Sequence, residues 1–385
     1  MVTGTFTVMS GIILAGSHRW DDSGFDELLP RPLMPVAQTP LIAHVLEWMR
    51  RGGIDRATIC ANSASRQVRD VLSNGAALDI ALDYYEDRTP RGPAGCIRDA
   101  AADMYADHYV VADGTILPRC NLATLLEAHR AAQAMLTIVV ARDGAETPGR
   151  RVRHVPAGIY VLSREVMAHI PETGYQDIKE VLLPLLHKKN LRTHAHVLSA
   201  AGARLTDAAS YLAMNALALE WLARGDRVVA GYRRVNGSLI HETADVAAPQ
   251  ELIGPLVVGP RARVAAGATL VGPTSIGPGS QIEANAAVCR SVLWEDCRVG
   301  SRASVNQCVL SAGTRVERGN SLYQLVCASN AGRRTNGRAG AEEWRWLSVW
   351  PHTDMEGPAR ETGEKRRYRL SPEESSSVRR NAASQ

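Results

Sequence analysis

The chain is poor in phenylalanine and lacks cysteine pairs at metal-binding spacing, and these absences exclude several classes of protein. Only 2 of its 385 residues are Phe, so the core must be built from Val, Ile, Leu and Ala. The 7 cysteines are odd in number and scattered, without a Cys-x-x-Cys pair. Neither a disulfide framework nor a zinc site is expected, and free thiols in a reducing cytoplasm fit best.

Long apolar runs and a strong excess of charge are also lacking. No segment approaches the roughly 20 apolar residues that span a bilayer, so no membrane association is predicted. The N-terminal stretch FTVMSGIILAG has neither a basic region nor a cleavage site of small residues, and it is typical of a buried first strand. The net charge is only +4, and part of it lies in the C-terminal tail, so the folded part is not expected to bind nucleic acid.

Strand-like and helix-like segments alternate from residue 7 to about 220. VMSGIILAG predicts a strand, and PLIAHVLEWMRRGGI predicts a helix that ends at Gly52 and Gly53. Further strands are expected in RATICAN, LDIALDYYED, HYVVADGTIL, MLTIVVA and AGIYVLS, with a turn at 88–95. This alternation predicts an α/β domain over residues 1–225, with a Rossmann-like, mostly parallel sheet covered on both faces.

A period of six residues follows from about residue 226. Aliphatic residues recur at this spacing, with slips of one residue after Val288 and after Val305, and small residues fill the places between. The recurring residues are Val258, Val264, Leu270, Ile276, Ile282, Val288, Leu293, Val299, Val305, Leu310, Val316 and Leu322. Such a repeat is the signature of a parallel β-helix, in which each short strand forms one side of a triangular coil. We assign residues 226–328 to a left-handed β-helix of hexapeptide repeats.

The remaining residues, 329–385, are rich in Gly, Arg, Ser and Glu, which predicts a largely disordered basic tail. The stretch EEWRWLSVWP is the exception, because Trp344, Trp346 and Trp350 lie too close together for a solvated linker. These side chains either fold back onto the β-helix or bind a partner. Packing within the chain is the favoured alternative.

The order of these segments carries a resemblance to a known family. An α/β domain that begins ILAG, a PLMPV loop before the first helix and a hexapeptide β-helix behind them resemble the sugar-1-phosphate nucleotidyltransferases. Among these NDP-sugar pyrophosphorylases, mannose-1-phosphate guanylyltransferase and ADP-glucose pyrophosphorylase are the most similar in this respect. The resemblance covers about residues 8–325. It implies a protein that joins a nucleoside triphosphate to a sugar 1-phosphate, using Mg²⁺ held by aspartates, and releases pyrophosphate.

The loop after the first strand departs from the family pattern. Family members carry G-G-x-G-T-R there and a Lys in K-P at its end. Gly16 is kept here, but Asp21 takes the place of the catalytic Arg, and Arg31 replaces the Lys. The change from Arg to Asp alters the charge by two units where a triphosphate should lie. Each unit is worth roughly 4 kcal/mol at ~4 Å and an effective dielectric constant near 20.

The Mg²⁺ ligands that the resemblance implies are altered as well. In VVADGTIL, Thr115 stands in the place of the family's aspartate, and Asp113 lies two residues upstream. In GARLTDAAS, Arg204 stands in the place of the second aspartate, and Asp207 follows three residues later. A neutral oxygen and a guanidinium cannot hold Mg²⁺, which prefers carboxylate oxygens in octahedral geometry. No cofactor is therefore expected.

One part of the family's nucleotide site is kept. PRGPAGCI retains the G-x-A-G core of the turn that contacts the nucleobase in relatives. Gly16, Gly92, Ala94 and Gly95 are therefore predicted to contact a nucleotide, although a tight turn with positive φ explains the last three equally well. The sugar-phosphate pocket, in contrast, is cut short. Only RDGAETPGRRVRHVP separates MLTIVVA from AGIYVLS, too little for the family's hairpin.

Hexapeptide β-helices also occur in acyltransferases, which use a histidine base on or beside the coil. No histidine lies between Glu242 and Pro351, so this interpretation depends on His241. The other histidines, such as His194 and His196 on one predicted strand, are more typical of surface or core positions.

Two hypotheses follow. The first is a catalytically degenerate relative, a pseudoenzyme that binds a sugar nucleotide and acts as a regulatory or assembly subunit in nucleotide-sugar or polysaccharide metabolism. Its β-helix would form a homo- or hetero-oligomer. The second is an active nucleotidyltransferase that uses Arg19 and Arg31 as phosphate cations, and Asp113 and Asp207 for Mg²⁺. The first is favoured, because no triphosphate then has to bind beside Asp21.

Overall fold

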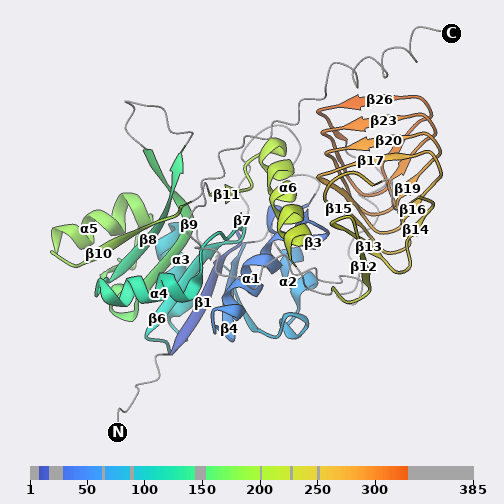
Figure 1. Ribbon diagram of the computed structural model, residues 1–385. Helices are drawn as coiled ribbons and strands as arrows, with labels where there is room; N and C mark the ends of the chain where they lie inside the picture. The colour runs from blue at the N-terminus through green and yellow to red at the C-terminus, as the bar shows by residue number, and fades with distance from the viewer. Residues whose placement is uncertain are drawn as a thin grey trace. The chain divides into compact units, whose positions relative to one another are not determined.

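A seven-stranded sheet forms the centre of the N-terminal half in the computed structural model (Figure 1). The structure describes residues 8–16, 29–62, 66–86, 91–143, 153–199, 202–225, 229–248 and 252–327. The strands of this sheet are β1 (Met9–Leu14), β4 (Arg56–Ala61), β5 (Ala81–Glu86), β6 (His108–Asp113), β8 (Leu136–Asp143), β9 (Arg153–Ser163) and β10 (Thr193–Val197). Their order is β10-β8-β9-β6-β1-β4-β5, and only β9 runs antiparallel to its neighbours. The predicted mostly parallel sheet is confirmed.

Helices cover both faces of the sheet, because successive side chains along a strand point to opposite sides. Ile13 faces the layer of α1 (Leu41–Arg51), α2 (Arg66–Leu72) and α4 (Leu122–Ala131). Ile12 faces the layer of α3 (Gly92–Ala101), η5 (Arg164–His169), η6 (Ile178–Leu182) and α5 (Leu183–Lys188). The shorter elements are η2 (Arg31–Leu33), β2 (Pro35–Val36), β3 (Thr39–Pro40), η4 (Ala76–Leu78), β7 (Ile116–Leu117) and β11 (Ala203–Arg204).

The C-terminal half consists of three sheets of short strands that the chain visits in turn; we call residues 238–327 the coil stack (Figure 1). The first sheet contains β12 (Tyr232–Val235), β13 (Ser238–His241), β15 (Leu256–Val258), β18 (Thr274–Ile276), β21 (Val292–Leu293), β24 (Val309–Leu310) and β27 (Val326–Cys327). The second contains β14 (Asp245–Val246), β16 (Arg263–Val264), β19 (Gln281–Ile282), β22 (Arg298–Val299) and β25 (Arg315–Val316). The third contains β17 (Thr269–Val271), β20 (Ala287–Cys289), β23 (Ser304–Asn306) and β26 (Ser321–Tyr323). Apart from β12 with β13, the pairs are parallel, which is compatible with the predicted β-helix.

The pairing register explains the slip in the sequence period. Leu256 pairs with Thr274, so the early coils repeat after 18 residues, whereas Val292 pairs with Val309, so the later coils repeat after 17. The shorter repeat begins at the corner after β20, where Arg290 has a φ of 47°. The recurring aliphatic residues point inward and are buried through most of the stack. One residue is thus removed at a corner, and the inward alignment of the strands is kept.

Helix α6 (Ala208–Arg224) joins the two halves through a shared core. The indole Nε1–H of Trp294 donates to the hydroxyl of Tyr211 at 3.0 Å, and that hydroxyl donates to the carbonyl of Pro35 at 2.5 Å. Val257 and Val309 of the coil stack belong to the same buried cluster. The α/β domain and the coil stack therefore meet over packed side chains.

Two further predictions concern membranes and the tail. Among the helices in the described ranges, none has the length and apolar character needed to cross a bilayer. The predicted tail at 329–385, with Trp344, Trp346 and Trp350, lies outside the described residues.

Candidate functional site

Three parallel strands, β1, β4 and β6, end together at one edge of the sheet. Leu14 at the end of β1 pairs with Asp113 at the end of β6, and the amide of Gly114 donates to the Leu14 carbonyl at 2.9 Å. On the other side, the amide of Ala15 donates to the Cys60 carbonyl at 2.8 Å. In open α/β sheets, ligands bind outside the carboxyl ends of the strands. Asp113 is the last residue of β6 and Gly16 follows β1, so this edge is the candidate site.

At this edge, Asp113 forms an ion pair with a residue that is distant in the sequence. The guanidinium Nη2 of Arg204 lies 2.5 Å from the Asp113 carboxylate Oδ2. Strand β11 positions the arginine, because Arg204 pairs with Ile116 of β7 directly after the Asp113 strand. The side chains of Arg204 and Asp113 are 30% and 20% exposed. The only carboxylate at the end of β6 therefore already has a cation as its partner.

Gly158 makes room for this ion pair. The residue lies in β9 with a φ of +80°, beside an irregularity in the pairing of β8 with β9. A Cβ atom at this position would lie 2.5 Å from Arg204 Nη2 and 2.6 Å from Asp113 Oδ2. Both distances are shorter than any real contact of a Cβ atom. Only glycine permits this backbone and this ion pair together.

The surrounding charges act on Asp113 in opposite directions. Burial raises the pKa of the Asp113 carboxyl, while the positive charges of Arg204 and Lys179 lower it. Burial also raises the pKa of Tyr160, and the nearby Asp113 carboxylate adds to that rise. The site thus combines one carboxylate, one bound guanidinium and a phenol that stays protonated at neutral pH.

This donor set does not fit Mg²⁺. A divalent cation needs several oxygen ligands in near-octahedral geometry, and a guanidinium in contact with the carboxylate repels it. Within the part of the chain that the structure describes, no group of three or more His, Cys, Asp or Glu side chains could hold a metal ion. The described residues therefore place a fixed cation beside Asp113.

Comparison with known proteins shows what this chain is similar to. Residues 27–150 match the family model described as nucleotidyl transferase. The chain is 24% identical over 251 residues to a mannose-1-phosphate guanylyltransferase of Mycobacterium tuberculosis, covering 60% of this chain and 69% of the relative. The chain is related to the sugar-1-phosphate nucleotidyltransferases. A probable mannose-1-phosphate guanylyltransferase of Oryza sativa is 25% identical over 274 residues, covering 64% of this chain and 75% of its own length.

The chain is also similar to a solved structure of HddC from Yersinia pseudotuberculosis complexed with GMP-PN. It is 17% identical, with a TM-score of 0.45, and the match covers 54% of this chain and 97% of that one.

Asp207 was predicted as an alternative metal ligand. In the structure it caps helix α6. Its Oδ1 accepts a hydrogen bond from the Ser210 amide at 2.7 Å, and this bond lowers the pKa of the carboxyl. The Ser210 hydroxyl in turn accepts from the Asp207 amide, which completes a capping box. The carboxylate therefore has a structural role at the start of the helix. Whether it also binds Mg²⁺ stays a prediction.

Arg31, predicted as a phosphate cation, lies inside the domain. Its side chain is 2% exposed, and its Nη1 donates to the carbonyl of Thr206 at 2.8 Å and to that of Leu205 at 3.4 Å. The guanidinium thus ties the start of the domain to the segment before α6. The other predicted phosphate cation, Arg19, lies outside the described residues, as does the altered loop with Asp21.

The predicted turn at 88–95 is corrected in part, because helix α3 begins at Gly92. Gly92 has the expected positive φ of 78°, and a Cβ atom there would lie 2.6 Å from the Gln176 carbonyl. The amide of Ala94 donates to that same carbonyl at 3.0 Å. Gly95 lies in the first turn of the helix, where a Cβ atom would lie 2.7 Å from Cβ of Arg91. These residues pack α3 tightly against residue 176, and their contact with a nucleotide stays a prediction.

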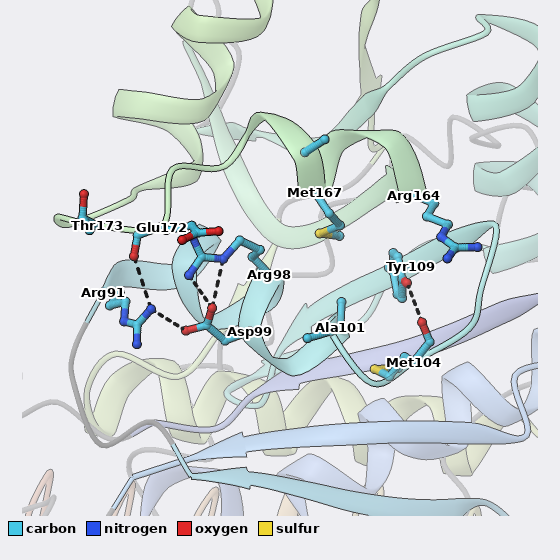
Figure 2. A pocket seen from close by; sticks show the side chains of 12 residues that line it. Arg91, Arg98, Asp99, Ala101, Met104, Tyr109, Arg164, Met167, Glu172 and Thr173 are labelled. Atoms are coloured by element: carbon cyan, nitrogen blue, oxygen red, sulfur yellow. Dashed lines mark hydrogen bonds and ion pairs between the residues drawn. The ribbon is translucent and has the colours of Figure 1, made fainter.

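A pocket of about 660 Å³ lies beside α3 (Figure 2). Arg98 and Arg91 both pair with the Asp99 carboxylate, at 2.5 and 3.2 Å. Arg98 also donates to the Pro171 carbonyl at 2.5 Å. The network fastens the segment that leads to Gln176 against the helix, so the charges of Arg98 and Asp99 serve the packing of this face.

The acyltransferase interpretation receives no support from His241. Its ring is 3% exposed and packs edge-on against Tyr232, with Nδ1 accepting a hydrogen bond from the Thr243 amide at 3.1 Å. This is the environment of a core histidine, without access for a substrate.

The positions of Gly158, Tyr160 and Lys179 near the ion pair were not predicted from the sequence. A glycine inside a strand is a known signal of a bulge or a close approach, so the glycine of AGIYVLS could have been identified. Lys179 follows Asp177, which caps η6 by accepting from the Lys179 amide at 2.7 Å. No local pattern indicates that this lysine lies near Asp113.

Proposed function

We propose that this chain is a sugar-nucleotide pyrophosphorylase-like protein that has lost catalysis and acts as a regulatory or assembly subunit in nucleotide-sugar or polysaccharide metabolism. The similarity to mannose-1-phosphate guanylyltransferases supports the broader class. The contact of Arg204 with Asp113 supports the loss of catalysis. In the places of the two Mg²⁺-binding aspartates that the family resemblance implies, the chain has Thr115 and Arg204, and Arg204 contacts Asp113, the nearby alternative ligand.

A Mg²⁺ ion near Asp113 would lie close to the Arg204 guanidinium, and each pair of unit charges at ~4 Å repels by about 4 kcal/mol at an effective dielectric constant near 20. Phosphoryl transfer depends on metal ions that neutralise charge on the phosphates. The guanidinium neutralises Asp113 itself, so the ion pair supports the structure of the site without offering a metal position.

Nucleotide binding without turnover is consistent with the remaining features. Gly16 follows the first strand, and Gly92, Ala94 and Gly95 lie in the first turn of helix α3, so these four are the proposed nucleotide contacts. A sugar nucleotide bound there would report the supply of activated sugar. The coil stack, which we infer to be a left-handed β-helix, would carry that signal through a homo- or hetero-oligomer.

An assay of pyrophosphate release tests the proposal. The wild-type chain is incubated with Mg²⁺, each common nucleoside triphosphate and a panel of sugar 1-phosphates, alongside an active mannose-1-phosphate guanylyltransferase. We expect no release above the rate without protein, because Mg²⁺ has no position beside Asp113. Turnover that is lost in Asp113→Ala and in Asp207→Ala would instead support the active enzyme with relocated ligands.

Thermal unfolding with sugar nucleotides tests the binding function separately. A ligand at 100 times its Kd stabilises the folded state by about 2.7 kcal/mol. We expect such a shift with at least one sugar nucleotide, reduced in Gly92→Ala. No shift with any nucleotide would contradict the sensing role.

A further inference from the structure

The last described coil lies at an open end of the coil stack (Figure 1). Its strands β25, β26 and β27 are each terminal in their sheet within the described part of the chain. Each therefore has a row of backbone N–H and C=O groups with no described strand beside it. Natural sheets cover or disrupt such edges, because they pair readily with other chains.

Apolar side chains of this coil are exposed where those of the coil before are buried. Val309 is 1% exposed, whereas its pairing partner Val326 is 37% exposed. Tyr323 and Leu325 of the same coil are 60% and 47% exposed. The end of the stack thus presents an apolar surface together with free sheet edges.

The chain itself carries a segment that suits this surface. Alternate residues of an extended strand share one face, so an extended WRWLSVW would place Trp344, Trp346 and Trp350 together on that face. The connection from Cys327 is short enough in sequence to keep the segment near the coil. At roughly 3.3 Å per residue it is also long enough to reach any of the three edges.

Charge complements the apolar match. Glu342 and Glu343 directly precede the tryptophans, and Arg315 and Arg318 are exposed on the last coil. Oppositely charged residues on two faces steer and orient their contact. The tryptophans of this sequence therefore complement the apolar surface of the open end, and the two glutamates complement its arginines.

We propose that residues 342–351, the tryptophan segment, cover the open end of the coil stack in the same chain. The segment adds its backbone to a free edge and lays its tryptophans over Tyr323, Leu325 and Val326. It thereby blocks end-to-end pairing with a second copy at this edge.

Hydrogen exchange of the full-length protein tests this proposal. In the wild type, we expect protected amides in both 321–327 and 343–350, at a level that does not change on dilution. A variant should lose this protection when its three tryptophans are replaced together (Trp344→Ser, Trp346→Ser and Trp350→Ser). Hydrogen exchange in both segments should become faster by about tenfold or more, because local opening determines protection. Amides of the earlier coils at 281–300 should be unaffected, which shows that the variant is folded.

The matched control changes the opposite face of the segment. Arg345→Ser with Val349→Ser should leave the protection of 321–327 at the wild-type level. Wild-type amides at 343–350 that exchange as fast as an unfolded chain would overturn the proposal without any variant. Protection of 321–327 that falls on dilution would also overturn it, by identifying a second copy as the occupant.

Discussion

At the scale of single residues, the contact between two oppositely charged side chains determines what the candidate site can bind. Asp113 at the end of β6 is a metal ligand only in the active-enzyme hypothesis, and Arg204 lies against it while Gly158 leaves the space that both need. Three residues from β6, β9 and β11 therefore depend on one another. A change at any of them tests the arrangement.

The first prediction concerns the glycine. Gly158→Ala should lower the free energy of unfolding by more than Gly53→Ala, its matched control. Both residues have positive φ, +80° and +85°, so both substitutions carry the left-handed backbone penalty of about 1–2 kcal/mol. Only at Gly158 does the new Cβ atom also collide with the ion pair, whereas nothing lies within 4 Å at Gly53. Equal losses in urea unfolding would contradict this explanation.

The second prediction concerns Mg²⁺. Arg204→Asp replaces the guanidinium with a second carboxylate beside Asp113, so the variant should be less stable than the wild type in EDTA and should regain stability in millimolar Mg²⁺. The wild type should show no such dependence, because its cation is built in. Thermal unfolding with and without Mg²⁺ measures both. Stabilisation of the wild type by Mg²⁺ would argue that the metal site persists.

At the scale of elements, helix α4 carries a buried polar group. His129 is 1% exposed; its Nδ1 lies 2.8 Å from the Thr137 hydroxyl and its Nε2 lies 3.2 Å from the Ser163 hydroxyl. The Ser163 hydroxyl donates to the Ala134 carbonyl, so its oxygen accepts from Nε2–H of the neutral ring. The ring thus links α4 to β8 and β9.

The third prediction follows from that environment. Burial lowers the pKa of His129 to about 4, below its ordinary 6.5, so the unfolded chain takes up the proton first as the pH falls. Stability should be lost between pH 6.5 and 4, at about 1.4 kcal/mol per pH unit. Urea unfolding at pH 7 and pH 5 should show a loss about 2 kcal/mol smaller in His129→Gln. The exposed His154→Gln is the control and should follow the wild type.

The elements also show how far sequence reasoning reaches. The strands and the aliphatic period could be predicted because each depends on side chains a few residues apart. The start of α3 was misassigned because Gly-Pro-Ala-Gly is typical of a turn, although a proline fits the first turn of a helix equally well.

Long-range partners account for the failures at the site. The buried carbonyl partners of Arg31 lie more than 170 residues away, so nothing near the arginine indicates that it faces inward. The same holds for Arg204. Its position was identified as altered, but its contact with Asp113 depends on β11 reaching β7.

At the scale of the whole molecule, the two halves are joined by Tyr211 and Trp294. The fourth prediction is that Tyr211→Phe lowers the free energy of unfolding by about 1–3 kcal/mol, because the buried Trp294 N–H and Pro35 carbonyl each lose a partner. Tyr175→Phe, at a tyrosine that is 63% exposed, should stay within about 0.5 kcal/mol.

Calorimetry measures the same connection in another way. Because the halves share one core, the wild type should unfold in a single transition. Two separate transitions in the wild type would show that this junction contributes little.

The repeat of 17 or 18 residues has an evolutionary consequence. Within the described residues, the strands of each coil pair with those of the coil before and the coil after it, and the α/β domain contacts this half through Val257, Val292, Trp294 and Val309. A duplication or loss of one full repeat beyond these contacts preserves the register of every remaining strand. Homologous genes can therefore differ in length by whole turns of this half, while the α/β domain keeps its size.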